Sequence, residues 1–415
     1  MVGIMSKKVI VLAANQAYVS YLETTIKSIC SHMKQIKFYI LNEDIPTDWF
    51  QLVENHLEKI DSEIVNVRCS SAMFQDYKLP TAHLNYATYF RYLIPNHVVE
   101  DRALYLDSDM IVTQDLSDLF ELDMQGYPVA AVEDLPTTSD KFNAGLLLMD
   151  NKKWREEDVV KQLFDLTAQH HHEVYGDQGI LNLAFQDNWY RLPLTYNLQV
   201  GSDSQQFTLG DMAWYDLFKG KPAVIHYTTG LKPWHQHHFN RFREEWWFYY
   251  GLSWEDILLR KYPAKEGWSA LVSKPPYQTA IYTNTVNLHE AENLIKALPQ
   301  VNFNILAHCY FAPEILMLEK YKNVTLFPCF DPLTHEKVFN QLDFYLDINY
   351  EGEIYNIIQK VVDKGIPFYS FQATNHAQEI SHYVFENQDV QGMIQHIKNY
   401  LDTLDNKEKE CKQNH

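Results

Sequence analysis

Short hydrophobic runs alternate with longer amphipathic stretches from the start of the chain. The run Val9–Ala14 predicts a buried strand, and Tyr18–His32 after it carries Leu22, Ile26 and Ile29 on one helical face. Further strands are expected at Lys37–Leu41, Ile64–Arg68, Ala103–Leu106, Val129–Val132, Gly145–Met149 and Ala223–His226, and further helices at Trp49–Ile60 and Asn85–Leu93. This order of elements is typical of an α/β protein with a mostly parallel sheet.

A second, smaller α/β unit is expected after a polar segment that contains proline and glycine. Residues 266–276 include Gly267, Pro275 and Pro276, a composition that favours a linker. Beyond it the strands expected are Thr279–Thr283, Phe303–Ala307, Val324–Pro328, Phe344–Asp347 and Pro367–Phe371, with helices such as Glu290–Leu298 and Ile354–Lys364 between them. We therefore expect one domain at 1–265, a parallel α/β domain of roughly five strands at 277–405, and a frayed polar tail at 406–415.

Charge and cysteine usage narrow the classes of function. The chain of 415 residues has 35 Lys and Arg against 54 Asp and Glu, a formal net charge of -19 that would repel a phosphate backbone. No apolar run approaches the roughly 20 residues that cross a bilayer. The five cysteines are scattered and never spaced as CxxC, as expected of reduced thiols in a cytosol. We expect a cytoplasmic protein with no transmembrane segment and no nucleic-acid partner.

Candidate chemistry begins where an expected strand ends in acid. Asp107 and Asp109 follow Ala103–Leu106 at positions i and i+2, so their side chains point to the same side. The carboxyl edge of a parallel sheet is where α/β proteins bind ligands, and paired carboxylates suit a divalent cation that bridges the oxygens of a diphosphate. An Asp-x-Asp pair is common by chance, so the prediction depends on its position at the end of a strand.

His226 ends another expected strand and is a candidate third ligand of the same cation. Its imidazole, in the neutral form, would complete a set of two carboxylates and one nitrogen that suits manganese. In the segment after it, Gly230 permits close approach of the backbone and Lys232 offers a positive charge to a phosphate. The alternative is a strand-to-loop junction whose histidine and lysine are only solvated.

These two segments resemble the motifs of glycosyltransferase family 8. The resemblance extends over residues 8–262 and implies a GT-A fold with a Rossmann-like mixed sheet, UDP-sugar donors, manganese dependence and retention of the anomeric configuration. The stretch Ala13–Tyr18 resembles the loop that holds the uracil, where Asn15 would bond the base and Tyr18 would stack on it. The family often has Asp and Asn in this loop, so Asn15 and Ala17 depart from its pattern.

Four further segments resemble the parts of the family that bind the sugar. Arg91 would reach the donor sugar or diphosphate, Asn143 in Phe-Asn-Ala-Gly would touch the hexose, and Asp134 would bond its hydroxyls. In Gly-Asp-Gln-Gly, Asp177 would bind the hexose and Gln178 would lie near the anomeric carbon. The implied donor contacts are Ala13, Asn15, Tyr18, Arg91, Asp107, Ser108, Asn143, Gly230 and Lys232; the implied catalytic residues are Asp134, Asp177 and Gln178; the implied metal ligands are Asp107, Asp109 and His226.

Each of these residues also has an ordinary structural interpretation. A buried amide such as Asn143 usually bonds to backbone, Asp177 is placed to cap a helix, and any one of the 27 tyrosines, Tyr18 included, is more often a packing residue. The weight of the resemblance comes from the order in which the motifs occur.

The resemblance implies a Mn²⁺-dependent retaining hexosyltransferase that moves galactose or glucose from a UDP-sugar to a glycan. Residues 277–405 look like a degenerate nucleotide-binding half of a GT-B glycosyltransferase. A family 8 module joined to such a domain resembles the bacterial enzymes that extend O-glycans on serine-rich surface adhesins, so the expected acceptor is an O-glycan on a Ser/Thr-rich protein. The alternatives are a lipopolysaccharide or teichoic-acid glycosyltransferase and a non-catalytic nucleotide-sugar-binding protein. The hexose, the linkage position and the oligomeric state stay open.

Overall fold

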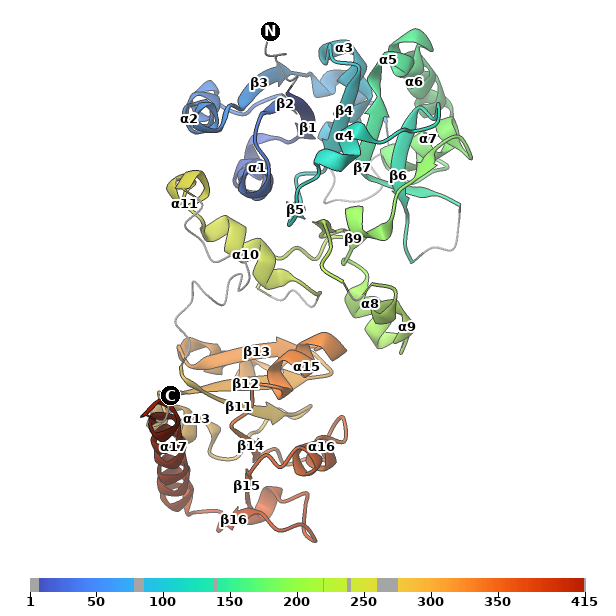
Figure 1. Cartoon of the computed structure of the whole chain (residues 1–415). Coiled ribbons are helices and arrows are strands. Elements are labelled where there is room, and N and C mark those ends of the chain that lie inside the picture. Colours follow the sequence, from blue (N-terminus) through green and yellow to red (C-terminus); the bar gives the residue numbers. More distant parts are fainter. Residues whose placement is uncertain are drawn as a thin grey trace. The chain divides into compact units, whose positions relative to one another are not determined.

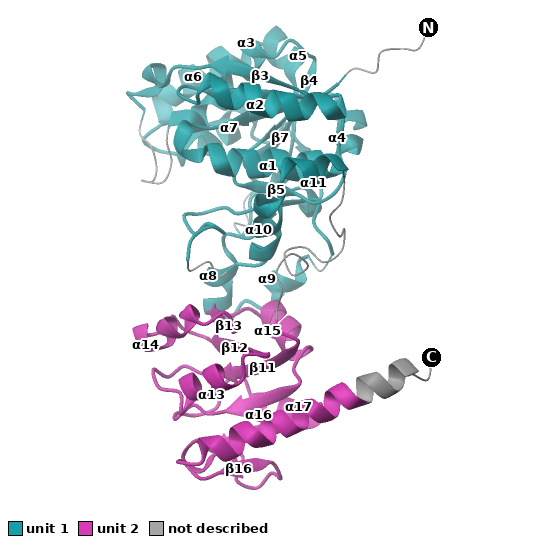
Figure 2. Ribbon diagram, turned by 90° about the vertical axis from the view of Figure 1, so that its left-hand side faces the viewer, with its two compact units in different colours: residues 1–268 teal, residues 269–415 magenta. Residues whose placement is uncertain are grey.

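The chain divides into two compact units, Met1–Trp268 and Ser269–His415 (Figure 2). The computed structural model describes residues 7–77, 86–136, 140–218, 220–236, 240–259 and 275–413, the last range with side chains to residue 406. Most of the expected linker, 266–274, lies outside the described residues. Each unit is a layered α/β structure with its own hydrophobic clusters.

A seven-stranded mixed sheet forms the centre of the first unit, in the order β3-β2-β1-β4-β7-β6-β8 (Figure 1). Its parallel strands are β1 (Lys8–Ala13), β2 (Ile36–Asn42), β3 (Glu63–Arg68) and β4 (Arg102–Leu106). Beyond β4 the sheet changes direction: β7 (Phe142–Asp150) is antiparallel to both β4 and β6 (Val129–Glu133), and β8 (Tyr190–Arg191) continues parallel to β6.

Both faces of this sheet are covered, which explains the unbroken hydrophobic runs of its strands. In β1, Ile10 and Leu12 enter one hydrophobic cluster, while Val9 and Val11 enter the other. The first cluster contains the buried faces of α1 (Val19–His32) and α2 (Thr47–Leu57). The second contains the 3-10 helix η4 (Tyr86–Leu93), α5 (Asn151–Glu156), α6 (Val159–His170) and α7 (Gly176–Phe185).

A small second sheet adjoins the end of β4 and was largely missed by the sequence pattern. It has the order β5-β10-β9, with β5 (Met110–Val112), β10 (Val224–His226) and β9 (Leu198–Gln199). β10 runs antiparallel to β5, so that His226 lies opposite Met110. Two short helices, α8 (Asp203–Thr208) and α9 (Ala213–Asp216), separate β9 from β10. After β10, α10 (Arg243–Gly251) and α11 (Trp254–Leu259) pack against α1.

The second unit is a six-stranded parallel sheet in the order β13-β12-β11-β14-β15-β16, one strand more than expected. Its strands are β11 (Tyr277–Tyr282), β12 (Val301–Ala307), β13 (Val324–Pro328), β14 (Phe344–Asp347), β15 (Phe368–Phe371) and β16 (Tyr383–Phe385). One hydrophobic cluster includes α13 (Ala291–Ala297), α14 (Pro313–Leu316) and α17; the other includes α15 (Pro332–Phe339) and α16 (Ile357–Asp363).

The C-terminal end differs from the expected frayed tail. Helix α17 extends over Val390–Gln413, so the stretch from residue 406 begins inside a helix. Met393, Ile394, Ile397 and Leu401 recur at helical spacing and are buried, which anchors the helix before its polar part begins. Lys and Glu are good helix formers, so they prolong the helix once that anchor exists. None of the helices in the described part of the chain has the length and hydropathy that a bilayer span requires.

Candidate active site

The turn between β4 and β5 presents two carboxylates and is tied to three neighbouring elements. The backbone N–H of Asp107 donates to the Gly145 carbonyl of β7 at 2.9 Å. Ser108 Oγ donates to the carbonyl of Ala13, at the end of β1, at 2.8 Å. Thr25 Oγ1 of α1 lies 3.0 Å from the Ser108 carbonyl and 2.9 Å from that of Met110. The positions of Asp107 and Asp109 are therefore set by the sheet and by α1.

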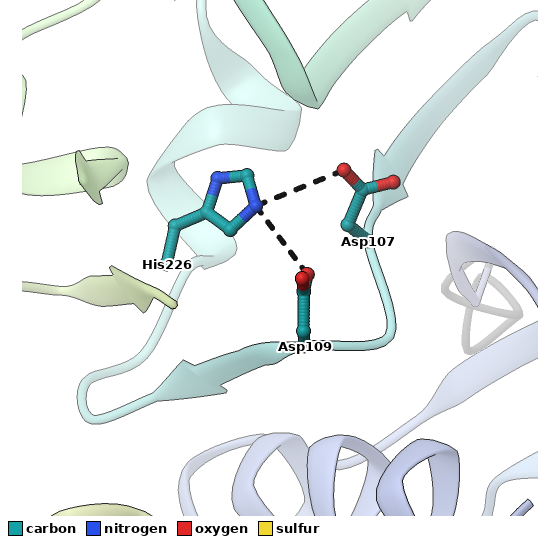
Figure 3. Close-up of side chains that lie close together, drawn as sticks. All are labelled: Asp107, Asp109 and His226. Carbon is teal, nitrogen blue, oxygen red and sulfur yellow. Dashed lines mark ion pairs between the residues drawn. The ribbon is translucent and has the colours of Figure 1, made fainter. Parts of the chain in front are cut away.

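His226 reaches the same place from β10, and Figure 3 shows its ring directed at both carboxylates. Its Nε2 lies 3.3 Å from Asp109 Oδ1 and 3.8 Å from Asp107 Oδ2. One potential ligand atom from each of the three residues lies within 4.8 Å of the others. Oδ1 of Asp109 is buried and, among the described residues, has no hydrogen-bond partner apart from the nearby imidazole. Two oxygens and one nitrogen that converge in this way fit a divalent cation with mixed ligands.

Two cationic side chains face this pair of carboxylates. Arg91 of η4 places Nη2 2.8 Å from Asp107 Oδ1, and Lys232 places Nζ 2.6 Å from Asp109 Oδ2. Burial raises the pKa of Asp107, although the charge of Arg91 opposes the rise. Burial alone would also raise the pKa of Asp109, but Lys232 and His226 hold it well below its usual range. Of these two carboxylates, Asp109 is therefore the one held more firmly in its ionised form.

Arg91 also joins the carboxylate pair to the Gly-Asp-Gln-Gly segment. Its Nε lies 2.9 Å from Asp177 Oδ2, and its guanidinium stacks on the ring of Tyr105 at 4.5 Å. Asp177 accepts a further bond from Thr88 Oγ1 at 2.7 Å. Asp177 lies in the first turn of α7, whose N-cap position is held by Tyr175, so the expectation of a capping aspartate was wrong.

Asp134, Asn143 and Gln178 form one hydrogen-bonded cluster. Nδ2 of Asn143 and Nε2 of Gln178 each donate to a different oxygen of Asp134, both at 3.0 Å. Oε1 of Gln178 accepts from the backbone N–H of Ala144 at 3.0 Å. Burial raises the pKa of Asp134 above its ordinary value. The three side chains are therefore oriented by one another and by the backbone of β7.

A pocket beside the carboxylates collects most of the predicted donor contacts. The predicted residues among its lining are Ala13, Asn15, Tyr18, Arg91, Asp107, Ser108, Asp109 and Lys232. Asn15 Oδ1 is buried and has no hydrogen-bond partner among the described residues. Burial and the charge of Asp109 raise the pKa of Tyr18 to about 12, so its hydroxyl stays protonated. Gly230 is exposed and does not line the pocket, and the left-handed residue of its loop is Thr229, with φ of 70°.

The sequence analysis missed several residues of the site: Ala14, Ala87, Thr88 and Tyr105 also line the pocket, and Asn197 contacts a candidate metal ligand. Asn197, fully buried just before β9, lies between His226 and Asn143. Its Oδ1 is 3.0 Å from His226 Nδ1, and its Nδ2 donates to Asn143 Oδ1 at 2.9 Å. A single asparagine in Leu-Thr-Tyr-Asn-Leu carries no spacing signal, because the residues it contacts lie far along the chain.

Comparison with known proteins places this arrangement in a family. The model of "Glycosyl transferase family 8" matches residues 9–238, and that of the "GftB/GlyA-F C-terminal domain" matches residues 279–414. Glycosyltransferase GlyB of Streptococcus pneumoniae serotype 4 is 45% identical over 405 residues, which are 96% of this chain and 100% of that protein.

Two solved structures extend the comparison to the fold. The crystal structure of the glycosyltransferase GlyE of S. pneumoniae covers 95% of this chain and 100% of its own, at 33% identity and a TM-score of 0.55. The galactosyltransferase LgtC, in complex with donor and acceptor sugar analogs, covers 59% of this chain and 95% of its own, at 26% identity and a TM-score of 0.52. The expected GT-A type mixed sheet is confirmed, and the protein is a glycosyltransferase. The chain belongs to glycosyl transferase family 8.

Proposed function

We propose that this glycosyltransferase moves galactose or glucose from a UDP-sugar to a glycan acceptor, with Mn²⁺ held by Asp107, Asp109 and His226. The observation that carries the proposal is the convergence of these three side chains within 4.8 Å, beside a pocket lined by Asn15 and Tyr18. Retention of the anomeric configuration is part of the proposal.

The uridine is proposed to bind in the pocket formed by the loops after β1 and β4. The Oδ1 atom of Asn15 offers an acceptor that no described residue of the chain uses. Tyr18 supplies an aromatic face, and its ring is braced edge-on by Tyr21 at 5.1 Å. Ser108 Oγ donates a hydrogen bond to the Ala13 carbonyl, which ties the loop after β4 to the loop after β1.

The diphosphate is proposed to lie where the charged side chains gather. A bound divalent cation would neutralise the negative charge that develops on the departing UDP. Lys232 and Arg91 are buried at this place and supply fixed positive charge. Asp109 holds Lys232 in place, and Asp107 and Asp177 hold Arg91 in place. The two cations therefore require little reorganisation during the reaction.

The hexose is proposed to be oriented by Asp134, Asn143, Asp177 and Gln178. The first two and Gln178 are linked by hydrogen bonds of 3.0 to 3.2 Å, and a preorganised set of this kind lowers the entropic cost of positioning the sugar. Gln178 would face the anomeric carbon on the acceptor side and stabilise the positive charge there. In a retaining reaction of this type the UDP oxygen would take the proton of the acceptor hydroxyl on the same face.

Galactose is favoured as the hexose because LgtC, which matches the first unit, is described as a galactosyltransferase. An O-glycan on a serine-rich protein is favoured as the acceptor because the second unit matches the GftB/GlyA-F C-terminal domain. The alternative of a lipopolysaccharide or teichoic-acid enzyme is less favoured, because the lipopolysaccharide 1,2-glucosyltransferase of Escherichia coli matches only 60% of this chain, at 26% identity. A cytoplasmic location stays a prediction.

Release of UDP tests the donor and the metal together. We expect purified protein with Mn²⁺ to release UDP from UDP-galactose faster than from UDP-glucose or the N-acetyl sugars. Asp109→Asn should reduce the rate by at least about 100-fold, because the carboxylate most firmly held in its ionised form is lost. The product with a glycan acceptor should be the α-anomer by proton NMR. A β-anomer would overturn retention, and full activity of Asp109→Asn would remove the metal from the mechanism.

A further inference from the structure

Asn197 lies at the junction between the proposed metal ligands and the proposed sugar-binding cluster. It is fully buried, and both ends of its amide are engaged: Oδ1 with His226 Nδ1 at 3.0 Å and Nδ2 with Asn143 Oδ1 at 2.9 Å. None of the predicted roles includes it. Which end of this amide faces the histidine decides what the imidazole can do.

The orientation of Asn143 is fixed by groups that have no choice of role. The backbone N–H of Gly145 can only donate, and it lies 3.0 Å from Asn143 Oδ1. The carboxylate of Asp134 accepts a bond at 3.0 Å from the other end of the same amide. The atom of Asn143 that faces Gly145 is therefore the oxygen, and the atom that faces Asp134 is the nitrogen.

This orientation fixes Asn197 in turn. The end of Asn197 that contacts the oxygen of Asn143 must be its NH₂ group, because two amide oxygens would repel each other. The opposite end, which faces His226, is then the carbonyl oxygen, and an amide oxygen can only accept. The hydrogen of a neutral His226 imidazole must therefore lie on Nδ1.

The position of the hydrogen on His226 decides whether the ring nitrogen that faces the carboxylates can bind a metal ion. With the hydrogen on Nδ1, the lone pair of a neutral imidazole lies on Nε2, the atom directed at Asp109 at 3.3 Å and at Asp107 at 3.8 Å (Figure 3). A metal ion needs that lone pair, and the hydrogen bond made by the other ring nitrogen commonly selects it. A backbone N–H of β7 thus sets the tautomer of a histidine on β10 through two amides.

We propose that Asn197 is a positioning residue that holds His226 as the Nδ1–H tautomer and couples the metal ligands to the sugar-binding cluster. The proposal rests on the metal site of the proposed function. It assigns the two ends of one side chain to two measurable properties: the carbonyl oxygen supports metal affinity, and the NH₂ group supports donor binding through Asn143.

The tautomer can be measured directly on the unaltered protein. In protein labelled with ¹⁵N-histidine we expect His226 to carry a hydrogen on Nδ1, the ring nitrogen that faces the Asn197 carbonyl, with the signals assigned by their loss in His226→Gln. An Nε2–H tautomer would overturn the proposal whatever the variants do.

Two substitutions separate the two ends of the amide. Asn197→Leu removes both, and we expect its affinity for Mn²⁺, titrated by electron paramagnetic resonance in the presence of UDP, to fall about 10- to 100-fold. Asn197→Asp keeps an acceptor for His226 but faces Asn143 with a second oxygen. We expect it to bind Mn²⁺ as tightly as the wild type or more tightly, while KM for the UDP-sugar rises about 5- to 100-fold. Equal losses of Mn²⁺ affinity in both variants would contradict the assignment.

Controls separate the role of Asn197 from the proposed metal site on which it rests, and from a general loss of stability. Asn151→Leu removes another fully buried amide of the same unit, one that donates to the Val98 and Glu100 carbonyls, and we expect it to lower stability without altering Mn²⁺ affinity. If Asp109→Asn also leaves Mn²⁺ binding intact, the metal site itself is wrong. If only Asn197→Leu leaves it intact, the metal site stands and the role of Asn197 falls.

Discussion

Gly145 leaves room for the ring of His226, the proposed metal ligand. A Cβ added there would lie 2.2 Å from His226 Cε1 and 2.8 Å from Met110 Cε, so the imidazole would have to leave its position. We expect Gly145→Ala to lower Mn²⁺ affinity about tenfold or more, by the same displacement of a ligand that disturbs other metal sites. Titration of Mn²⁺ in the presence of UDP measures it.

The matched control is Gly352→Ala, where an added Cβ meets nothing within 4 Å. Its Mn²⁺ affinity should equal that of the wild type. A Gly145→Ala protein with normal affinity would mean that His226 does not need its place against β7.

Arg91 holds the buried carboxylate of Asp177 and the partly buried carboxylate of Asp107 at once, so we expect its loss to lower stability. Arg91→Met leaves Asp107 and Asp177 without their shared counter-charge, and breaking a buried pair costs about 3 to 5 kcal/mol. Urea denaturation should show this loss, and Arg91→Lys, which keeps the charge but loses the planar fork, should fall between Met and the wild type.

A double variant tests the cause. Adding Asp177→Asn to Arg91→Met removes one uncompensated charge, so the double variant should be more stable than Arg91→Met alone. Simple addition of the two losses would rule out the ion pair as the source of the effect.

Residue patterns indicated which residues form the candidate site better than they indicated the contacts between those residues. Asp107 and Asp109 follow β4, and His226 ends β10, which pairs with the unpredicted strand β5 and not with β4. The ligand atoms of the three residues lie within 4.8 Å of one another. The bridge made by Arg91 between Asp107 and Asp177, and that made by Asn197, could not be predicted. Both depend on distances between segments that neither spacing nor periodicity encodes.

At the scale of elements, strands of four or more residues were predicted, whereas among those of two or three residues only β10 was. Val324–Pro328 and Phe344–Asp347 were placed to the residue. By contrast, β5, β9 and β16 have only two or three residues, too few for a periodicity to appear, and they form because neighbouring strands supply hydrogen-bond partners. Helix α17 continues past residue 405, where the second domain was expected to end, because its buried residues precede the polar stretch.

Two histidines of the second unit should give it opposite responses to pH. Burial lowers the pKa of His335, on α15, to about 4, so the unfolded chain binds the extra proton first as pH falls through 6.5, and stability is lost toward pH 4. The hydrogen bond to Asp347 raises the pKa of His376, so its contribution is complete below pH 6.5 and is lost as pH rises through the raised value.

We therefore expect the contribution of this pair to be greatest near pH 6.5. Denaturation of His335→Gln should show a flatter acid limb than the wild type, by about 1 to 3 kcal/mol between pH 7 and 4.5. His376→Gln should flatten the alkaline limb instead. If both variants follow the wild-type profile with a constant offset, the two histidines contribute by packing only.

At the scale of the whole molecule, the two units have separate hydrophobic clusters, and every residue proposed to bind the donor belongs to the first. We expect residues 275–415 expressed alone to unfold cooperatively, and residues 1–274 to retain release of UDP from the UDP-sugar. Circular dichroism and the UDP assay measure the two outcomes. A first unit that folds but neither binds Mn²⁺ nor releases UDP would show that the second unit completes the site.

In the small sheet of β5, β10 and β9, the position of His226 is independent of the segment that connects β9 to β10. β9 and β10 are parallel neighbours, with Gln199 beside His226, and the segment between them leaves β9 beside His226 and enters β10 beside Thr195. This excursion carries α8, α9 and the exposed Leu209, Met212 and Leu217, yet His226 keeps its place through its register with Met110. The length or sequence of this stretch can therefore change while His226 keeps its position beside Asp107 and Asp109.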